Sequence, residues 1–590
     1  MSADLTIFPR RLFSRRRRLA APGRTLGAVL CAILMTACAS QGGAAAAPGA
    51  DPRASAGNTL SGNYLAARHA QATKSDDMAA DFLLAALAKS PDDPFLLQRA
   101  HNALLSDGRV AEAARLAARM PAADQAGDLP ALTRAVDAIK SGRYGEVASI
   151  LKADGPSQTL ALLLRAWSMQ GLGKTDQALA ALKAIKPEEA GTGLYHLHAA
   201  LLNDAAGRKS EAATQARAAV QGEGVPPVRT VQLVGAILVR AGAADEAKAL
   251  YAKALEGYGG DDTGSLPALL QALPAAADPT KPVMASAADG AAEALFQASG
   301  AMAHKEVRDQ ALMVGKLGLY LKPDFPFLQM FVAELLDAAG RPADANRLYA
   351  GVDRASPLAW QARLSHAQNL ERMDRFAEAE KALRAMAAER PQDPHALLLL
   401  GDMLRQRERF VEAVPVYDQA IALKEPLPQR YWRVLYARGI ALERAKQWER
   451  AEGDFLRALE MEPDQPLVLN YLGYSWVEQG ERLEEAQDMI RRAVELRPND
   501  GFIVDSLGWV YYRLGKNQEA VVQLERAVEL QPEDPVINDH LGDAYLAVGR
   551  QREAHFQWRA ALGLDPEPEV RAELERKLQG VIREASAAPQ

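Results

Sequence analysis

The stretch "LGWVYYRLGKNQEAVVQLERAVELQP", Leu507–Pro532, decides the fold, because its glycine–lysine step has two interpretations. Gly-Lys followed by a polar residue suggests a phosphate-binding loop, whereas a glycine between two amphipathic stretches predicts a turn between helices. Together with Val504 just before it, the first half places apolar or small residues at helical spacing, as in Leu507, Gly508 and Tyr511. Gly515 interrupts that pattern, and a second apolar stripe follows until proline ends the unit. The stretch therefore predicts two antiparallel helices joined at Gly515.

The same arrangement returns at intervals of 34 or 35 residues in the C-terminal part of the chain. Each unit has a small residue at one place on each helix, and these are Gly439, Gly473, Gly508, Gly542 and Ala451, Ala486, Ala520, Ala554. A proline stands twelve residues after each alanine, at Pro463, Pro498, Pro532 and Pro566. We expect the eight small residues to lie where the two helices of a pair pack most closely. The pattern closely resembles the tetratricopeptide repeat (TPR).

The marker alanine can be followed towards the N-terminus, which extends the predicted repeats over residues 62–568. It is found at Ala413, Ala379, Ala345, Ala311, Ala247, Ala212, Ala178, Ala113 and Ala79, with Val147 in the equivalent place. The expected fold is an all-α TPR superhelical solenoid of antiparallel helix pairs, divided into two arrays. The expected parts are a degenerate N-terminal array (62–258), a break or hinge (259–306), a C-terminal array (307–568) and a capping helix with a tail (569–590).

The N-terminus has the pattern of an export signal. Seven arginines precede the apolar stretch Thr25–Ala37, which is too short to span a bilayer. "LMTAC" resembles the lipobox of bacterial lipoproteins, which implies a signal peptide over 1–37, lipidation of Cys38 and a disordered tether over 38–61. Ala39 after the cysteine favours an outer-membrane protein, anchored on the periplasmic face. Ordinary cleavage near Ala37–Ala39, which would give a soluble periplasmic protein, is the alternative.

Charge and cysteine content restrict the classes of partner and site. The net charge of −6 contains +6 from residues 1–37, which leaves −12 for the remainder and argues against a nucleic-acid partner. The only cysteines are Cys31 and Cys38, so the body has neither a disulfide framework nor a cysteine-based metal site. His196 and His198 are the closest histidines, but residues two apart on a helix point to different faces.

No sequence pattern indicates catalysis or a cofactor. "SMQGLGKT", Ser168–Thr175, is similar to a phosphate-binding loop, but it lacks the first glycine and follows a helical pattern. Its distance from Ala178 predicts an inter-helix turn instead. The catalytic motifs of hydrolases and metalloproteases are absent from the sequence. We therefore expect a protein that is not an enzyme and that has no cofactor and no metal.

The expected function is binding of proteins or peptides by the concave groove that stacked first helices form. The register of the C-terminal repeats predicts groove-lining side chains at Tyr436, Asn470, Tyr474, Asp505, Trp509, Tyr512, Asp539 and Asp543. Aromatic residues on a polar surface are frequent anchors of interfaces, although most such aromatics could equally be core. For Trp558 we expect the core. The acids favour a neutral or basic, partly apolar partner segment.

The C-terminal strings "YLGYSW", "DSLGWVYYRLG" and "HLGDAYLAVGR", together with the lipobox and the repeat coverage, resemble the LbcA-type TPR lipoproteins of proteobacteria. This resemblance implies a non-catalytic, lipid-anchored scaffold that recruits a carboxyl-terminal processing protease, its substrates or other envelope enzymes. A structural role in export or assembly of an envelope polymer such as an exopolysaccharide is the alternative.

Overall fold

The computed structural model describes residues 59–587, except for 121–128, 152–157, 186, 223, 259–279 and 304–306. Its regular elements are α-helices and two short 3-10 turns, with no strand among the described residues. This confirms the predicted all-α solenoid of antiparallel helix pairs. The signal sequence 1–37, Cys38 and most of the tether lie outside the described residues. No described helix combines the length and apolar composition that a membrane span requires.

The chain forms two compact units that divide after Met386. We refer to residues 59–386 as the N-terminal unit and to residues 387–587 as the C-terminal unit. The division differs from the predicted break at 259–306, because the later part of that segment forms α15, Ala287–Ala301. This helix packs against α8, Gln158–Gly171, and its residues Ala291, Ala292, Ala294 and Leu295 are buried. α15 therefore belongs to the N-terminal unit and packs against an earlier helix of that unit.

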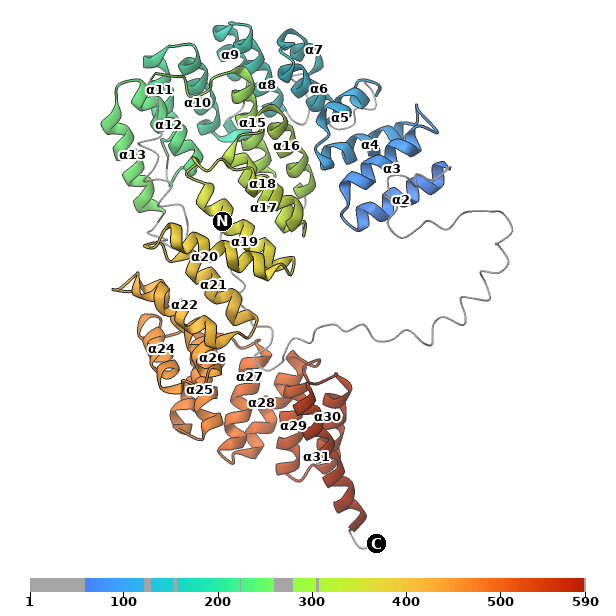
Figure 1. Cartoon of the computed structure of the whole chain (residues 1–590), viewed down its shortest axis with the longest axis vertical. Coiled ribbons are helices and arrows are strands. Elements are labelled where there is room, and N and C mark those ends of the chain that lie inside the picture. The colour runs from blue at the N-terminus through green and yellow to red at the C-terminus, as the bar shows by residue number, and fades with distance from the viewer. Residues whose placement is uncertain are drawn as a thin grey trace. The chain divides into compact units, whose positions relative to one another are not determined.

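The N-terminal unit consists of successive helices in antiparallel pairs, together with the 3-10 turn η2, Tyr144–Glu146 (Figure 1). The helices besides α8 and α15 are α2 (Leu60–Ala72), α3 (Asp76–Leu87), α4 (Pro94–Asp107), α5 (Val110–Ala117), α6 (Leu129–Lys140), α7 (Val147–Ile150), α9 (Thr175–Leu182), α10 (Pro187–Ala205), α11 (Lys209–Ala219), α12 (Val228–Arg240), α13 (Ala244–Gly257), α16 (Arg308–Leu321), α17 (Pro326–Ala338), α18 (Pro342–Ala350), α19 (Ala359–Arg372) and α20 (Phe376–Glu389), the last of which crosses the division.

The C-terminal unit is a regular succession of helix pairs with the 3-10 turn η4, Gln429–Tyr431. Its helices are α21 (His395–Gln406), α22 (Phe410–Ala422), α23 (Trp432–Arg444), α24 (Trp448–Met461), α25 (Pro466–Gln479), α26 (Leu483–Leu496), α27 (Gly501–Arg513), α28 (Asn517–Leu530), α29 (Pro535–Ala547), α30 (Gln551–Gly563) and α31 (Pro568–Ala587).

The glycine–lysine step is a joint between helices. Gly515 lies between α27 and α28 with a φ of 74°, in the left-handed region that favours glycine. The Lys516 amide donates to the carbonyl of Tyr511 at 2.9 Å, which ends the first helix. Gly173 has the same φ of 74° between α8 and α9, and Thr175 is the first residue of α9. Both lysine-containing turns are therefore inter-helix turns, as the spacing predicts.

The small marker residues lie at contacts between the two helices of a pair. Ala451, Ala486, Ala520 and Ala554 are fully buried. A Cβ on Gly508 would lie 2.5 Å from Leu524, and one on Gly542 would lie 2.4 Å from Trp558. Comparable distances are 2.5 Å at Gly439 and 2.8 Å at Gly473. Since real Cβ atoms do not approach other atoms so closely, each glycine sets how near the paired helices can come.

We expect the substitution Ala520→Leu to lower the unfolding free energy by about 1–3 kcal/mol, because a larger side chain overpacks the contact between α27 and α28. Urea denaturation of the full chain would measure the loss. Val522→Leu on the same helix is the control, since Val522 is 61% exposed and its enlargement meets no neighbour. Equal effects of the two substitutions would contradict the close contact at Ala520.

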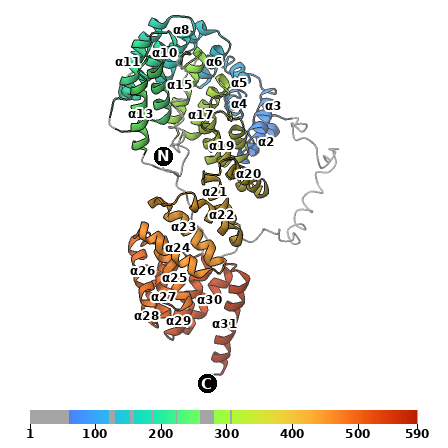
Figure 2. The ribbon, with the colours of Figure 1, turned by 60° about the vertical axis from the view of Figure 1, so that its left-hand side comes forward.

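In the N-terminal unit, α15 and α16 pack against earlier helices far away in the sequence. α15 contacts α6 and α8, and α16 contacts α4, α5 and α6. Both views show α15 beside these earlier helices, and Figure 1 also shows α16 there (Figures 1 and 2). At the contact with α8, a Cβ on Gly290 would lie 2.2 Å from the buried Trp167 ring. α15 and α16 therefore cover part of the earlier row of helices, α4 to α8, within the same unit.

An ion pair and a hydrogen bond connect these two helices to earlier ones. Arg229 of α12 donates to Glu293 of α15 at 2.7 Å, and the Glu293 side chain is fully buried. The Tyr320 hydroxyl of α16 donates to Asp137 of α6 at 2.9 Å. Because a buried carboxylate needs a partner, the Arg229–Glu293 pair ties α15 to α12 in one arrangement.

Candidate functional site on the C-terminal unit

The first helices of neighbouring pairs contact one another in the C-terminal unit: α21 with α23, α25 with α27, and α27 with α29. Acidic side chains fix where two of them begin. Asp500 accepts from the Phe502 amide at 3.2 Å, and Asp534 accepts from the Val536 amide at 2.9 Å. Because neighbouring first helices are in contact, some of their side chains are buried between them, while others remain partly exposed.

Four of the predicted partner residues lie at contacts between helices and not on an open surface. Tyr436, Asn470, Asp505 and Asp539 occupy the same register in successive units, and each exposes 7% or less of its surface. The Tyr436 ring lies 5.9 Å from that of Tyr471 and 6.1 Å from that of Phe455. Their register turns these side chains towards adjacent helices, which corrects their placement in an open groove.

The other predicted residues, Tyr474, Trp509, Tyr512 and Asp543, are partly exposed. The Trp509 ring stacks on His540 at 4.1 Å and on Tyr512 at 5.0 Å between ring centroids. Its indole N–H donates to Glu478 at 2.7 Å. We call Trp509, Tyr512 and His540 the aromatic cluster. It combines fixed rings with surrounding carboxylates, a combination suited to holding an apolar or cationic group.

Within the aromatic cluster, His540 forms a buried pair with Asp505. Its Nδ1 lies 3.0 Å from both carboxylate oxygens of Asp505, and both side chains are buried. Burial by itself lowers the pKa of His540, but the attraction and hydrogen bond of Asp505 outweigh it, with Asp539 and Asp543 adding to the effect. The pKa of His540 is therefore raised above its ordinary value of 6.5, which favours the imidazolium under the Trp509 ring.

The raised pKa of His540 predicts a pH-dependent stability of the C-terminal unit. A group with a higher pKa in the folded state stabilises the fold fully below its unfolded pKa of about 6.5, and this contribution disappears as the pH rises through the folded value. The stability difference between wild type and His540→Gln should therefore shrink from pH 6 towards pH 9 in urea denaturation. The stability difference between wild type and Asp505→Asn, which removes the main charge partner of His540, should also shrink over this pH range. A difference that stays constant over this range would contradict the pair.

The acids near the C-terminal end of the unit are neutralised within the chain. Lys577 of α31 donates to Asp539 at 2.6 Å and to Asp543 at 2.8 Å. Asp543 also accepts from the indole N–H of Trp558 at 3.1 Å. Trp558 is 1% exposed and belongs to the core, in line with the sequence-based expectation. A basic partner would meet Glu478 rather than these paired acids.

Sequence reasoning missed Glu478, His540 and Lys577 as parts of this surface. His540 precedes the marker Gly542 by two residues, and Asp505 precedes Gly508 by three, so their contact crosses two registers of the repeat. The spacing of 35 residues between Asp505 and His540 is one repeat plus one residue, and this is the signal that could have suggested the pair. Lys577 lies beyond the last repeat and gives no periodic signal.

Among the residues that the structure describes, no group of three or more His, Cys, Asp or Glu side chains is placed to hold a metal ion. His196 bonds to Gln215 at 2.8 Å, whereas His198 is fully buried and accepts from Trp167 at 3.0 Å. These two histidines consequently have separate structural contacts.

Models of tetratricopeptide repeat families match the sequence over 364–428, 436–501, 508–549 and 160–186. The chain carries tetratricopeptide repeats. Three of the four matched segments fall mainly in the C-terminal unit, where the glycine and alanine markers are regular, and one covers α8 and α9. TPR proteins generally mediate protein–protein interactions, and none of the matched models belongs to a catalytic family.

Several solved TPR structures are similar to the chain in fold. A TPR protein from Parabacteroides merdae is 18% identical, with coverage of 42% of this chain and 97% of that one and a TM-score of 0.35. The Cut9–Hcn1 structure is 15% identical, with 89% and 97% coverage and a TM-score of 0.36. YrrB, described as having an unusual peptide-binding site, is 19% identical, with 33% and 99% coverage and a TM-score of 0.27. A search of curated proteins found no matching sequence.

Proposed function

We propose that this TPR protein is a non-catalytic scaffold, lipid-anchored through Cys38 on the periplasmic face of the outer membrane. In this proposal the C-terminal unit recruits an envelope protein, with a carboxyl-terminal processing protease as the first candidate. The anchor rests on the lipobox-like sequence, and the protease on the resemblance to the LbcA-type lipoproteins. The observation that carries the binding role is the aromatic cluster, which keeps partly exposed rings on a buried support.

The chemistry of the aromatic cluster favours a particular kind of partner segment. Trp509 and Tyr512 present aromatic surface to an apolar side chain, and Glu478, with a side chain 48% exposed, lies beside them. Arg513 is 3.4 Å from Glu478 and would have to move aside for a competing cation. A partly apolar segment with a lysine or arginine next to an apolar residue therefore fits this surface best.

Affinity purification of the full chain from solubilised membranes tests the proposal. We expect a periplasmic protease or another envelope enzyme to be recovered with wild type, and to be depleted when Trp509 is replaced. Repeated purifications that recover no envelope enzyme would remove this function. A deletion strain that changes polymer secretion while periplasmic proteolysis stays normal would favour the polymer-export alternative instead.

A further inference from the structure

The N-terminal unit has an open pocket between its first two helix pairs. α16 reaches the C-terminal end of α4, where the Lys316 ammonium donates to the carbonyl of Ser106. Away from this contact, α2 and α4 line this open pocket, which has a volume of about 340 Å³. Gln71 lines it from α2, while the lining residues from α4 are Phe95, Gln98, Arg99 and Asn102.

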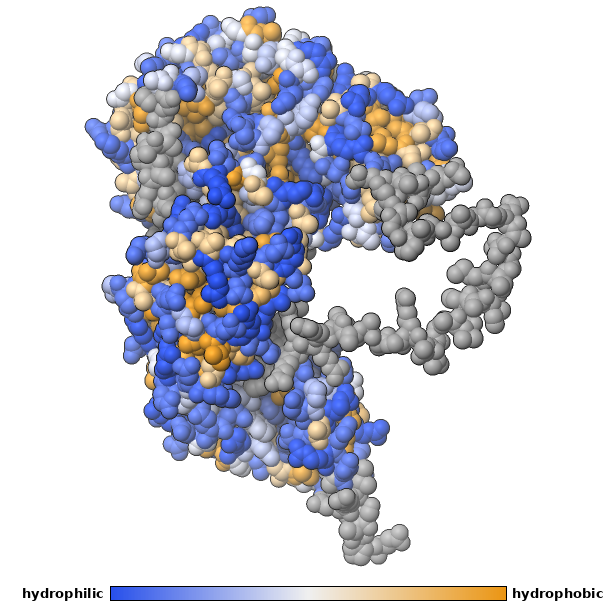
Figure 3. Space-filling model, viewed as in Figure 1, coloured by the Kyte–Doolittle hydropathy of each residue, from blue (hydrophilic) through white to orange (hydrophobic). Residues whose placement is uncertain are grey.

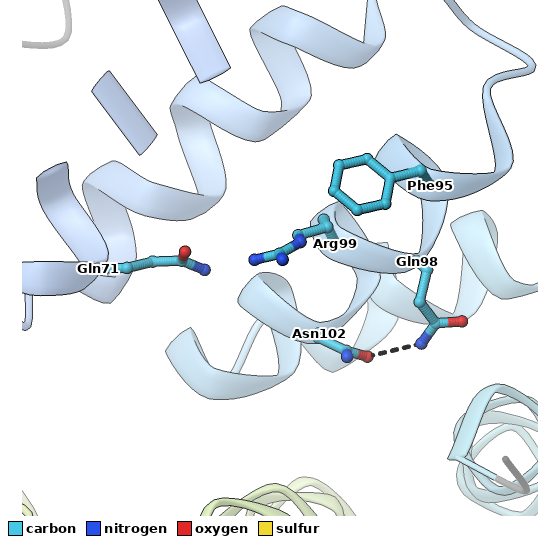
Figure 4. Close-up of a pocket in the computed structure, with 5 residues that line it drawn as sticks. All are labelled: Gln71, Phe95, Gln98, Arg99 and Asn102. Atoms are coloured by element: carbon cyan, nitrogen blue, oxygen red, sulfur yellow. Dashed lines mark hydrogen bonds between the residues drawn. The ribbon is translucent and has the colours of Figure 1, made fainter. Parts of the chain in front are cut away.

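The lining side chains combine a cation, amides and an aromatic ring. The Arg99 guanidinium extends towards Gln71 across the gap between α2 and α4, with the Phe95 ring beside it (Figure 4). The guanidinium carbon lies 5.0 Å from the centre of the Phe95 ring. Gln98 donates to Asn102 at 3.0 Å, which fixes two amide groups at one side of the pocket.

Arg99 has no acidic partner in the part of the chain that the structure describes, where its guanidinium makes neither a hydrogen bond nor an ion pair. By contrast, Arg109 is paired with Asp81 and Arg341 with Asp76. α2 contains no acidic residue, and the only one in α4 is its last residue, Asp107. The two helices that line the pocket therefore offer a positive site that lacks its anion.

Apolar surface accompanies this charge. Phe95 is 53% exposed, and its ring lies 5.9 Å from that of Tyr64. The space-filling view shows hydrophobic surface over the region of α4 (Figure 3). A ligand for this pocket must therefore supply an anionic group and an apolar group close together.

We propose that the pocket between α2 and α4 binds an extended segment of another protein in which an Asp or Glu side chain adjoins an apolar side chain. Arg99 pairs with the carboxylate, Phe95 packs against the apolar neighbour, and the amides of Gln71, Gln98 and Asn102 bond to the peptide backbone. This site has the opposite charge preference to the surface around the aromatic cluster, and its existence does not depend on the function proposed for the C-terminal unit.

A positional library of immobilised hexapeptides, N-acetylated and C-amidated, tests this with the fluorescently labelled full chain. We expect enrichment of Asp or Glu beside an apolar residue, and a loss of binding to the enriched peptides of about tenfold or more in Arg99→Gln. Arg115→Gln on α5 removes the same charge at an exposed position outside the pocket and should leave binding unchanged. Trp509→Ala should also bind normally, which separates this site from the C-terminal surface.

Three results would overturn the proposal. The first is no enrichment of acidic residues in the amidated library. The second is equal binding of the enriched peptides by wild type and Arg99→Gln, with circular dichroism showing both folded. The third is binding only in a parallel library with free carboxyl termini, which would assign the pocket to a chain terminus instead of an acidic side chain.

Discussion

Replacing Arg240 by leucine should lower the unfolding free energy by about 3–5 kcal/mol, because it leaves the buried carboxylate of Asp204 without its cation. Arg240 donates to Asp204 at 2.6 Å, and the two side chains are 6% and 1% exposed. The second oxygen of Asp204 accepts from the Val283 amide at 2.7 Å. One carboxylate thus joins α10, α12 and the segment that leads into α15. Removing the cation that neutralises it therefore destabilises three parts of the N-terminal unit.

Urea denaturation of the full chain measures this loss, and hydrogen exchange locates it. Amides of α10, α12 and α15 should exchange faster in Arg240→Leu, whereas those of the C-terminal unit should not. Arg217→Leu is the matched control, since Arg217 pairs with Glu246 where the side chains are 44% and 53% exposed. Solvent screens such a pair, so the control should change stability little. Similar losses in both variants would show that the Asp204 contact does not hold these parts together.

The regular part of the fold could be predicted because each repeat carries its own local signals. Gly515 ends α27 in the left-handed region, and Gly508 faces Leu524 within the same pair. These contacts connect residues fewer than 20 positions apart and return with every unit. A period in the sequence therefore identifies them without knowledge of the tertiary structure.

The position of α15 could not be predicted in this way, because its partners lie far away in the sequence and occur once. Glu293 pairs with Arg229, 64 residues before it, and Gly290 faces Trp167. Neither contact follows the repeat period. The segment from 259 to 306 therefore had the pattern of a gap between arrays, although part of it is a buried helix of the N-terminal unit.

The exposure of the predicted groove residues could be predicted only in part, because helical register fixes which residues share a face but not what covers that face. Asp505 and Trp509 are both on α27, yet Asp505 is buried against His540 while Trp509 is partly exposed. Arg99 and Phe95 were missed because the first repeats are degenerate. What marks them is a charge without an acidic partner among the described residues, beside an exposed ring, and this arrangement is visible only in the tertiary structure.

Replacing Trp509 by alanine should weaken partner binding about 30-fold or more, as expected when an aromatic anchor worth about 2 kcal/mol is removed from an interface. The indole is held by Glu478 and stacks on His540, so a partner meets a ring that is already ordered and loses little conformational freedom on contact. A photoreactive residue at position 509 would first identify the partner in living cells. The affinity of the full chain for that partner would then be compared with and without the substitution.

Trp448→Ala is the matched control for Trp509→Ala, because Trp448 is also partly exposed but begins α24, the second helix of its pair. Its loss should leave partner affinity unchanged if binding uses the first helices. Helical content should be similar in both variants, since neither ring is among the fully buried side chains. A large fall in melting temperature with unchanged affinity in Trp509→Ala would assign the ring to the support of α27 and α29. In that case the aromatic cluster would be structural, and the scaffold would have to bind its partner elsewhere.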